Sequence, residues 1–172
     1  CQMIPTSVLT VVDTLGIGGT ERAATNFALG YAMRGLDSRV WAVSAGGERR
    51  LQMMRSRIPV HVGEGLVEFL GSWRPDLVHL HSNGLSIQVI DCLVKLMPNA
   101  IFVEHNVFSK PTEWSSELSI SFQLTETALH RFARFGEGVH ATVVPNPVEV
   151  EDFFPDINAG LKMREALGIE SK

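Results

Sequence analysis

The chain has 172 residues and a formal net charge of −4; 45% of its residues are hydrophobic and 20% are charged. These values are typical of one globular domain with a buried core. They argue against a nucleic-acid partner, because no basic excess is present to neutralise phosphates. The two cysteines, Cys1 and Cys92, are too few for a disulfide framework, which favours a reducing compartment and predicts a cytoplasmic location. No apolar run reaches the roughly 18 residues of a membrane-spanning helix.

The first 31 residues predict a buried strand, a glycine loop and a helix. Val8, Leu9, Val11 and Val12 form an apolar, mostly β-branched run, as in a strand of a parallel sheet. The loop that follows contains three glycines, Gly16, Gly18 and Gly19. We expect Thr20 to be the N-cap of the helix, with Glu21 beside the positive end of the helix dipole. Such a junction directs free backbone N–H groups beyond the carboxyl end of the strand, where phosphates bind well.

Two other interpretations of this stretch stay open. A nicotinamide-binding domain needs a third glycine in the loop and an acidic residue after the second strand. Here Glu21 occupies the position of the third glycine, and the second predicted strand ends at residues 44–46 without a carboxylate. In the other interpretation the glycines only form a tight turn with positive φ angles.

The rest of the chain alternates strand-like and helix-like segments. Strands are expected at residues 38–44, 58–62, 77–80, 100–104, 118–122 and 141–144. Helices are expected up to Gly35 and at residues 48–57, 64–73, 86–97, 125–135 and 161–168. The side chains expected to face inward around the 125–135 helix are Leu124, Ala128, Leu129, Phe132 and Phe135. The short links predict right-handed crossovers and an α/β fold, a Rossmann-like three-layer sandwich with a mainly parallel sheet.

Three histidines lie at or near the predicted strand ends. His79 and His81 are two residues apart on one strand and therefore face the same side. Together with His105 they have the composition of a metal site, but we expect His79 to be a hydrogen-bonded core residue and predict no metal here. His105 and Asn106 follow the fifth strand, at the edge where open α/β sheets bind ligands. A neutral imidazole in that place is suited to stabilising charge or relaying a proton.

Five motifs follow one another in a specific order along the chain. They are Gly-Gly-Thr-Glu at 18–21, Pro-Asp-Leu-Val-His-Leu-His-Ser at 75–82, Val-Glu-His-Asn at 103–106, Val-Val-Pro-Asn-Pro-Val-Glu at 143–149 and Arg-Glu-Ala-Leu-Gly-Ile at 164–169. Together they resemble the N-terminal half of family-4-type glycosyltransferases with the GT-B fold. The resemblance implies that residues 1–150 are a Rossmann-like, acceptor-side domain. It also implies that residues 151–172 are a linker and helix leading to a C-terminal domain that this chain lacks.

The chain departs from the family pattern at three points. Pro147 stands where the family usually has glycine, and it stiffens the linker turn. The strand expected at residues 118–122 lacks the family's aspartate. The family's Glu-x7-Glu pair belongs to the C-terminal domain, and no two glutamates of this chain have that spacing. Most of the donor site would therefore lie in that second domain.

The resemblance implies a retaining, metal-independent transfer of a sugar, as in polysaccharide biosynthesis, without a cofactor. The donor would be a nucleotide-sugar, and the acceptor a hydroxyl of a saccharide, a lipid or a polysaccharide precursor. The resemblance implies a catalytic role for His105. The implied donor-binding residues are Gly16, Gly18, Gly19, Thr20 and Glu21, and the implied acceptor-binding residues are His81, Ser82, Asn83, Asn106 and Lys110. The 172-residue chain alone is expected to be inactive. Two alternatives to the glycosyltransferase interpretation stay open: a nucleotide-binding domain of an oxidoreductase or epimerase, and a non-catalytic binding domain.

The segment at residues 48–57 is basic and contains four arginines, Arg49, Arg50, Arg55 and Arg57. In one interpretation it is a solvated helix face. In the other it binds a phosphorylated acceptor or the anionic inner face of a membrane, which would make the protein peripheral there.

Overall fold

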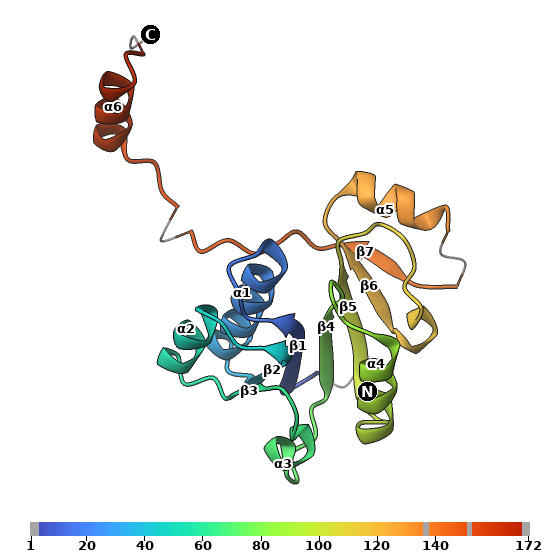
Figure 1. Ribbon diagram of the computed structural model, residues 1–172. Coiled ribbons are helices and arrows are strands. Elements are labelled where there is room, and N and C mark those ends of the chain that lie inside the picture. Colours follow the sequence, from blue (N-terminus) through green and yellow to red (C-terminus); the bar gives the residue numbers. More distant parts are fainter. Residues whose placement is uncertain (1–3, 136–137, 151–152, 170–172) are drawn as a thin grey trace.

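The computed structural model describes residues 4–135, 138–150 and 153–169, and its centre is a sheet of seven parallel strands (Figure 1). The strands lie in the order β3-β2-β1-β4-β5-β6-β7. They are β1 (Ser7–Thr14), β2 (Asp37–Ala45), β3 (Val60–Val62), β4 (Leu77–His81), β5 (Ile101–Asn106), β6 (Ile120–Gln123) and β7 (Ala141–Val143). The helices are α1 (Gly19–Met33), α2 (Arg49–Arg55), α3 (Leu66–Leu70), α4 (Ile87–Leu96), α5 (Glu126–Ala133) and α6 (Ile157–Ala166).

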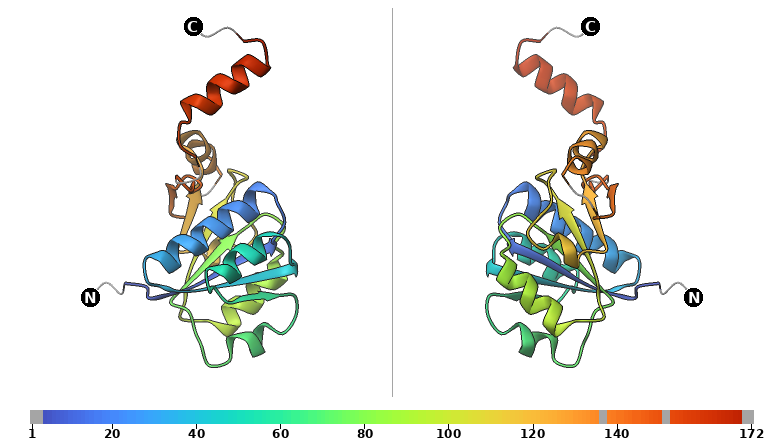
Figure 2. Two further views of the ribbon diagram at one scale, coloured as in Figure 1. Left: turned by 90° about the vertical axis from the view of Figure 1, so that its left-hand side faces the viewer. Right: turned by 90° about the vertical axis from the view of Figure 1, so that its right-hand side faces the viewer.

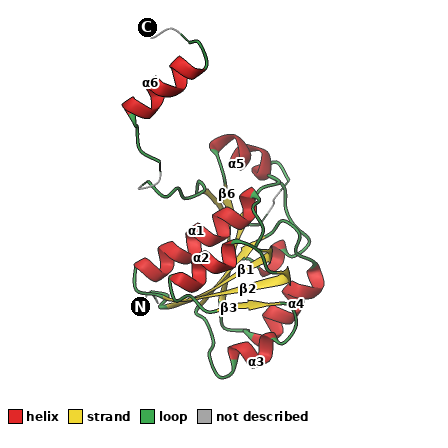
Figure 3. Ribbon diagram, turned by 60° about the vertical axis from the view of Figure 1, so that its left-hand side comes forward, coloured by secondary structure: helices red, strands yellow, loops and turns green. Residues whose placement is uncertain are grey.

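Helices cover both faces of the sheet and give three layers (Figure 2, Figure 3). On one face, α1 and α2 bury a core that includes Val12, Ala24 and Met53. On the other face, α3 and α4 bury a second core around Leu9 and Leu80. Helix α5 lies beside β6 and β7. The predicted α/β, Rossmann-like fold is confirmed, because the described strands are all parallel and β1 and β2 contribute apolar side chains to both cores.

Two central strands extend further than the sequence predicts. β4 includes His81, and β5 runs to Asn106 rather than ending at residue 104. Parallel pairing holds these polar residues in the sheet, since His81 lies opposite His105 and Asn106 lies opposite Gln123. His105 and Asn106 are therefore buried strand residues, not loop residues.

Three helix predictions need correction. The N-cap of α1 is Gly18 and not Thr20, because the backbone is already helical at Gly19. Phe135 is 68% exposed, since α5 ends at Ala133 and leaves it beyond the helix. The last helix begins at Ile157 rather than at residue 161, because the Asp156 carboxylate caps it by accepting a hydrogen bond from the Ala159 N–H at 2.9 Å.

The segment after β7 lies against α1 and α2. The Asn26 amide donates to the Pro147 carbonyl at 3.0 Å, and the Gln52 amide donates to the Glu149 carboxylate at 2.9 Å. Helix α6 stands apart from the sheet and has no buried residue (Figure 1). The predicted domain boundary after residue 150 borders residues 151–152, which lie outside the described residues.

Cys92 of α4 is exposed and unpaired within the described part of the chain, whereas Cys1 lies outside it. Among the described helices, none has the length and the apolar character that crossing a lipid bilayer requires.

Candidate functional site

The loop between β1 and α1 brings a helix N-terminus to the carboxyl edge of the sheet. The N-cap Gly18 is extended, with φ −64° and ψ 170°, and offers no side-chain cap. The first backbone hydrogen bond of the helix runs from the Arg22 N–H to the Gly18 carbonyl, at 3.0 Å. The N–H groups of residues 19–21 therefore have no acceptor within the helix and are free to bind an anion.

Contacts within the chain leave no room for a Cβ at only one of the three loop glycines, Gly18. Gly16, Gly18 and Gly19 are not among the described glycines with positive φ, so the tight-turn interpretation is wrong. A Cβ at Gly19 would meet no atom within 4 Å, and one at Gly16 would meet only Thr14 Oγ1, at 3.8 Å. A Cβ at Gly18, by contrast, would collide with the Glu21 carboxylate. The space beside Gly16 and Gly19 is open to a ligand.

Glu21 folds back over this loop. Its Oε1 accepts a hydrogen bond from Thr14 Oγ1 at 2.9 Å, which ties the first turn of α1 to the end of β1. A carboxylate in this place is also stabilised by the helix dipole. Glu21 thus has a structural role, and its contact with a donor stays a prediction.

Arg49 differs from the other arginines of the basic segment in its burial and in its contact with the glycine loop. Gly47 packs so closely on the Leu15 backbone that a Cβ there would overlap it, which brings the start of α2 against the glycine loop. The half-buried Arg49 side chain donates from Nη2 to the Ile17 carbonyl at 3.4 Å. The three remaining arginines, Arg50, Arg55 and Arg57, are exposed. The contact of this segment with a membrane stays a prediction.

A cavity of about 230 Å³ joins the N-terminus of α1 to the ends of β4 and β5. Its lining includes Gly19, Thr20, Ala23, His81, His105 and Asn146. The structure therefore brings predicted donor-binding residues together with the predicted catalytic histidine and one predicted acceptor-binding histidine. Asn146 joins them from the segment after β7.

His81 and His105 belong to a histidine cluster, formed with His79, that lies buried beneath α1. The ring centroids of His79 and His81 are 4.5 Å apart, which confirms that these two side chains share a face. The rings of His81 and His105 stack at 5.6 Å with planes 17° apart. Phe27 lies against all three rings, with centroid distances of 4.8, 5.8 and 5.1 Å. His79 Nδ1 shares a hydrogen bond with the Tyr31 hydroxyl at 2.9 Å, so it is the hydrogen-bonded core residue that the sequence predicts.

Burial keeps the histidine cluster uncharged at neutral pH. It lowers the pKa of His79 to about 3 and the pKa of His105 to about 4. Burial, and then repulsion from the other two rings, holds the pKa of His81 well below its ordinary value. The ring nitrogens of His81 have no hydrogen-bond partner among the described residues. His105 faces the Asn146 side chain, and hydrogen bonding to it partly offsets the lowering of the His105 pKa by burial. These rings can therefore offer a ligand hydrogen bonds but no positive charge.

The histidine cluster does not have the geometry of a metal centre. Within residues 4–135, 138–150 and 153–169, no three or more histidine, cysteine, aspartate or glutamate side chains are arranged to hold a metal ion. The rings of His81 and His105 are stacked, which does not direct their nitrogens to one shared point.

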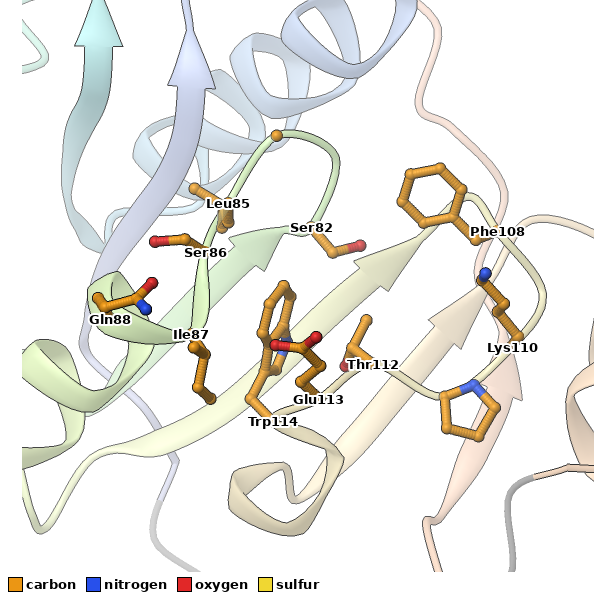
Figure 4. A pocket seen from close by; sticks show the side chains of 12 residues that line it. Ser82, Leu85, Ser86, Ile87, Gln88, Phe108, Lys110, Thr112, Glu113 and Trp114 are labelled. Atoms are coloured by element: carbon orange, nitrogen blue, oxygen red, sulfur yellow. The ribbon is translucent and has the colours of Figure 1, made fainter.

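A larger cavity, of about 490 Å³, lies beside the start of α4 (Figure 4). Two predicted acceptor-binding residues, Ser82 and Lys110, line it. Phe108, Thr112 and Trp114 of the segment after β5 complete its wall. We call this cavity the α4 pocket.

The two remaining predicted acceptor-binding residues do not line either cavity. Asn83 is exposed, and its Nδ2 lies 3.5 Å from Thr20 Oγ1. Asn106 is fully buried; it donates to Glu104 Oε1 and to the Lys110 carbonyl and accepts from the Phe108 N–H. The Asn106 side chain is thus occupied within its own loop, and its binding of an acceptor stays a prediction.

Sequence reasoning did not find Glu104, Phe108 and Asn146 as site residues. Glu104 carried a signal, because a charged residue directly after the apolar residues 101–103 is unusual in a central parallel strand. Phe108 carried none, since it lies in an irregular segment whose course depends on tertiary contacts. Asn146 belongs to the motif at residues 143–149, but the sequence favoured a role in the linker turn over a role in binding.

Comparisons with known proteins support the fold. No protein-family model matches the chain, and no curated protein matches it by sequence. Among solved structures, the chain is similar to the crystal structure of a glycosyltransferase from Rickettsia africae ESF-5, with a TM-score of 0.65 and 15% sequence identity. The match covers 96% of this chain and 50% of that chain, so this chain spans about half the length of its structural neighbour. At this identity the likeness shows that the two proteins share the Rossmann-like fold.

Proposed function

We propose that this chain is the acceptor-side half of a retaining GT-B glycosyltransferase of the family-4 type. The complete enzyme would move a sugar from a nucleotide-sugar to an acceptor hydroxyl. The sequence motifs and the fold shared with the glycosyltransferase from Rickettsia africae ESF-5 support this proposal. The observation that carries it is the cavity in which the open N-terminus of α1 meets His81 and His105.

The glycine loop would bind part of the donor diphosphate. The free N–H groups of residues 19–21 and the helix dipole favour a negative charge at this place. The Arg49 guanidinium lies at the edge of the same loop and adds a formal positive charge. Stabilising the leaving diphosphate would be the main catalytic contribution of this region.

His105 would act as a neutral hydrogen-bonding group in catalysis. Because its pKa is about 4, it carries no charge at neutral pH and is a weak base. Its role would be to orient the transferred sugar or the acceptor hydroxyl and to pass on a proton as charge develops. The second domain of the complete enzyme would supply most of the contacts with the nucleotide and the sugar.

Gly19→Ala tests the proposal, with Gly30→Ala as its matched control. Both glycines lie in α1 at ordinary φ angles, and a Cβ meets nothing within 4 Å at Gly19 and only Arg34 Nη1, at 3.7 Å, at Gly30. Both substitutions should leave the fold intact, and Gly30→Ala, inside the helix, should raise stability by up to about 1 kcal/mol. Only Gly19→Ala should place a methyl group in the ligand space.

The measurement is sugar transfer from a panel of labelled nucleotide-sugars by the complete gene product that contains this chain. We expect Gly19→Ala to lower kcat/KM at least about tenfold, which corresponds to about 1.4 kcal/mol of transition-state stabilisation, and Gly30→Ala to leave it unchanged. Equal activity of the two variants would contradict the assignment of the loop. Sugar transfer by residues 1–172 alone would show that no second domain is needed.

A further inference from the structure

The α4 pocket has the lining of a binding site for an uncharged, hydroxyl-rich molecule. In Figure 4, Phe108 and Lys110 lie on one side of the pocket, Gln88 of α4 lies on the other, and Trp114 lies between them. Its volume of about 490 Å³ falls within the roughly 300–1,000 Å³ that small-molecule sites occupy. Phe108 is 49% exposed, so an aromatic face is available to an apolar ligand surface.

The charges around the pocket balance each other. Lys110 and Glu113 both line it and are both exposed, and neither forms a salt bridge with another described residue. An anion would meet the Glu113 carboxylate and a cation would meet the Lys110 ammonium, whereas hydroxyl groups can donate to the first and accept from the second. An aromatic face beside such groups suits a sugar ring, which carries C–H groups on its faces and hydroxyls at its edge.

A buried carboxylate holds the wall of the pocket. Glu104 has no exposed surface, and four side chains donate to it. Its Oε2 accepts from Thr112 Oγ1 and from Trp114 Nε1, both at 3.2 Å. Its Oε1 accepts from Asn106 Nδ2 at 2.9 Å and from Ser121 Oγ at 2.7 Å.

The same network extends to the mouth of the pocket through Asn106. This side chain donates to the Lys110 carbonyl at 2.8 Å and accepts from the Phe108 N–H at 2.8 Å. Phe108, Lys110, Thr112 and Trp114 are thus all connected to Glu104, directly or through one residue. Burying a carboxylate is unfavourable unless hydrogen bonds compensate for it, and apolar side chains can fill such a space with equal stability. The four donors compensate for the burial of Glu104, and through them this carboxylate links β5 and β6 to residues 112 and 114 of the pocket wall.

We propose that the α4 pocket binds an uncharged saccharide and that Glu104 is the positioning residue that holds residues 106–114 in the binding shape. The inference deepens the proposed function, because the saccharide would be the sugar acceptor. The pocket and the glycine loop are lined by different residues, so each can fail without the other.

The first test is saturation-transfer NMR on the 172-residue chain with methyl α-D-glucopyranoside, methyl α-D-mannopyranoside and methyl α-D-galactopyranoside. Glucose 6-phosphate is the charged probe. We expect saturation of at least one methyl glycoside, its loss in Phe108→Ala and its retention in Gly19→Ala. No saturation of any methyl glycoside, saturation that survives Phe108→Ala, or stronger binding of glucose 6-phosphate would overturn the inference. A donor-site failure would instead appear only in the transfer assay of Gly19→Ala.

The second test asks whether Glu104 positions the pocket wall or only contributes to the stability of the fold. Glu104→Gln keeps the shape of the side chain but offers an amide N–H₂ where two donors now bind an oxygen. We expect it to weaken glycoside binding at least about tenfold and to move the NMR signal of the Trp114 indole N–H. The indole signals of Trp41 and Trp73 should stay in place.

The matched control is Ser38→Ala, which removes another buried hydrogen bond, from Ser38 Oγ to the Ala28 carbonyl at 3.0 Å, away from the pocket. It should leave glycoside binding and the Trp114 signal unchanged. If Glu104→Gln does not fold, Thr112→Val removes a single donor to Glu104 and decides the question in the same way. Unchanged binding in the folded variant, or an equal loss in Ser38→Ala, would overturn the role of Glu104.

Discussion

The histidine cluster predicts that mild acid destabilises this protein strongly. His79, His81 and His105 are buried and uncharged, and burial lowers the pKa of each, to about 3 for His79 and about 4 for His105. In the unfolded chain the same side chains take up protons near the ordinary value of about 6.5. Between about pH 6.5 and pH 4 the unfolded state therefore binds more protons than the folded state. The free energy of unfolding is highest above this window and falls as the pH falls through it.

The expected effect is large compared with the stability of a domain. A histidine that stays neutral in the folded state lowers the free energy of unfolding by about 2 kcal/mol when the pH falls from 7 to 5. Three such residues lower it by about 5–6 kcal/mol. A typical domain has about 5–15 kcal/mol in all, so this chain should be close to unfolding at pH 5. Tyr31 also faces the cluster but does not titrate in this window, because a tyrosine hydroxyl ordinarily ionises near pH 10 and burial raises the pKa of Tyr31 further, to about 12.

Urea denaturation at several pH values between 5 and 7.5, followed by circular dichroism, measures this effect. His81→Asn removes one titrating ring without breaking a hydrogen bond and should remove about one third of the pH dependence. A free energy of unfolding that stays constant from pH 7 to pH 5 would refute the account of three neutral, buried histidines.

Two further predictions concern local contacts. Gly18→Ala should displace the Glu21 carboxylate from Thr14 and lower the free energy of unfolding by about 1 kcal/mol. In a Glu21→Ala background the same substitution should have almost no effect. Urea denaturation of the wild type, the two single variants and the double variant measures this, and additive effects of the two substitutions would reject the contact. Asp76 accepts hydrogen bonds from the backbone and side chain of both Thr6 and Ser7, and these bonds lower its pKa. Its stabilising effect is therefore present above its ordinary pKa near 3.8 and is lost as the pH falls below that value. Asp76→Asn should therefore be less stable than the wild type at neutral pH and should approach it in acid, and an equal difference at both pH values would exclude this role.

The sequence predicted the fold because the fold rests on local periodicity. Apolar strands alternating with amphipathic helices suffice to specify a parallel sheet, and all seven strands were found. Strand ends were less accurate, since His81, His105 and Asn106 are polar and look like loop residues until a neighbouring strand pairs with them. Thr20 failed as an N-cap because Gly18 and Gly19 begin the helix first.

The site was only partly predictable, because its contacts are distant in the sequence. Strand spacing predicted that His79 and His81 share a face, but not that Phe27 of α1 covers them. The partners of Glu104 include Trp114 and Ser121, which lie 10 and 17 residues away in irregular structure or on another strand. Local sequence patterns carry no information about such pairs.

Strand β5 connects the two cavities through the alternation of its side chains. His105 points to the α1 side of the sheet, where it stacks on His81 and lines the cavity at the glycine loop. Glu104 and Asn106 point to the other side, where they hold the wall of the α4 pocket. Because successive residues of a strand face opposite sides, one short segment fixes both a group next to the proposed donor and the wall of the proposed acceptor site. Any shift of β5 would therefore move the linings of both cavities together.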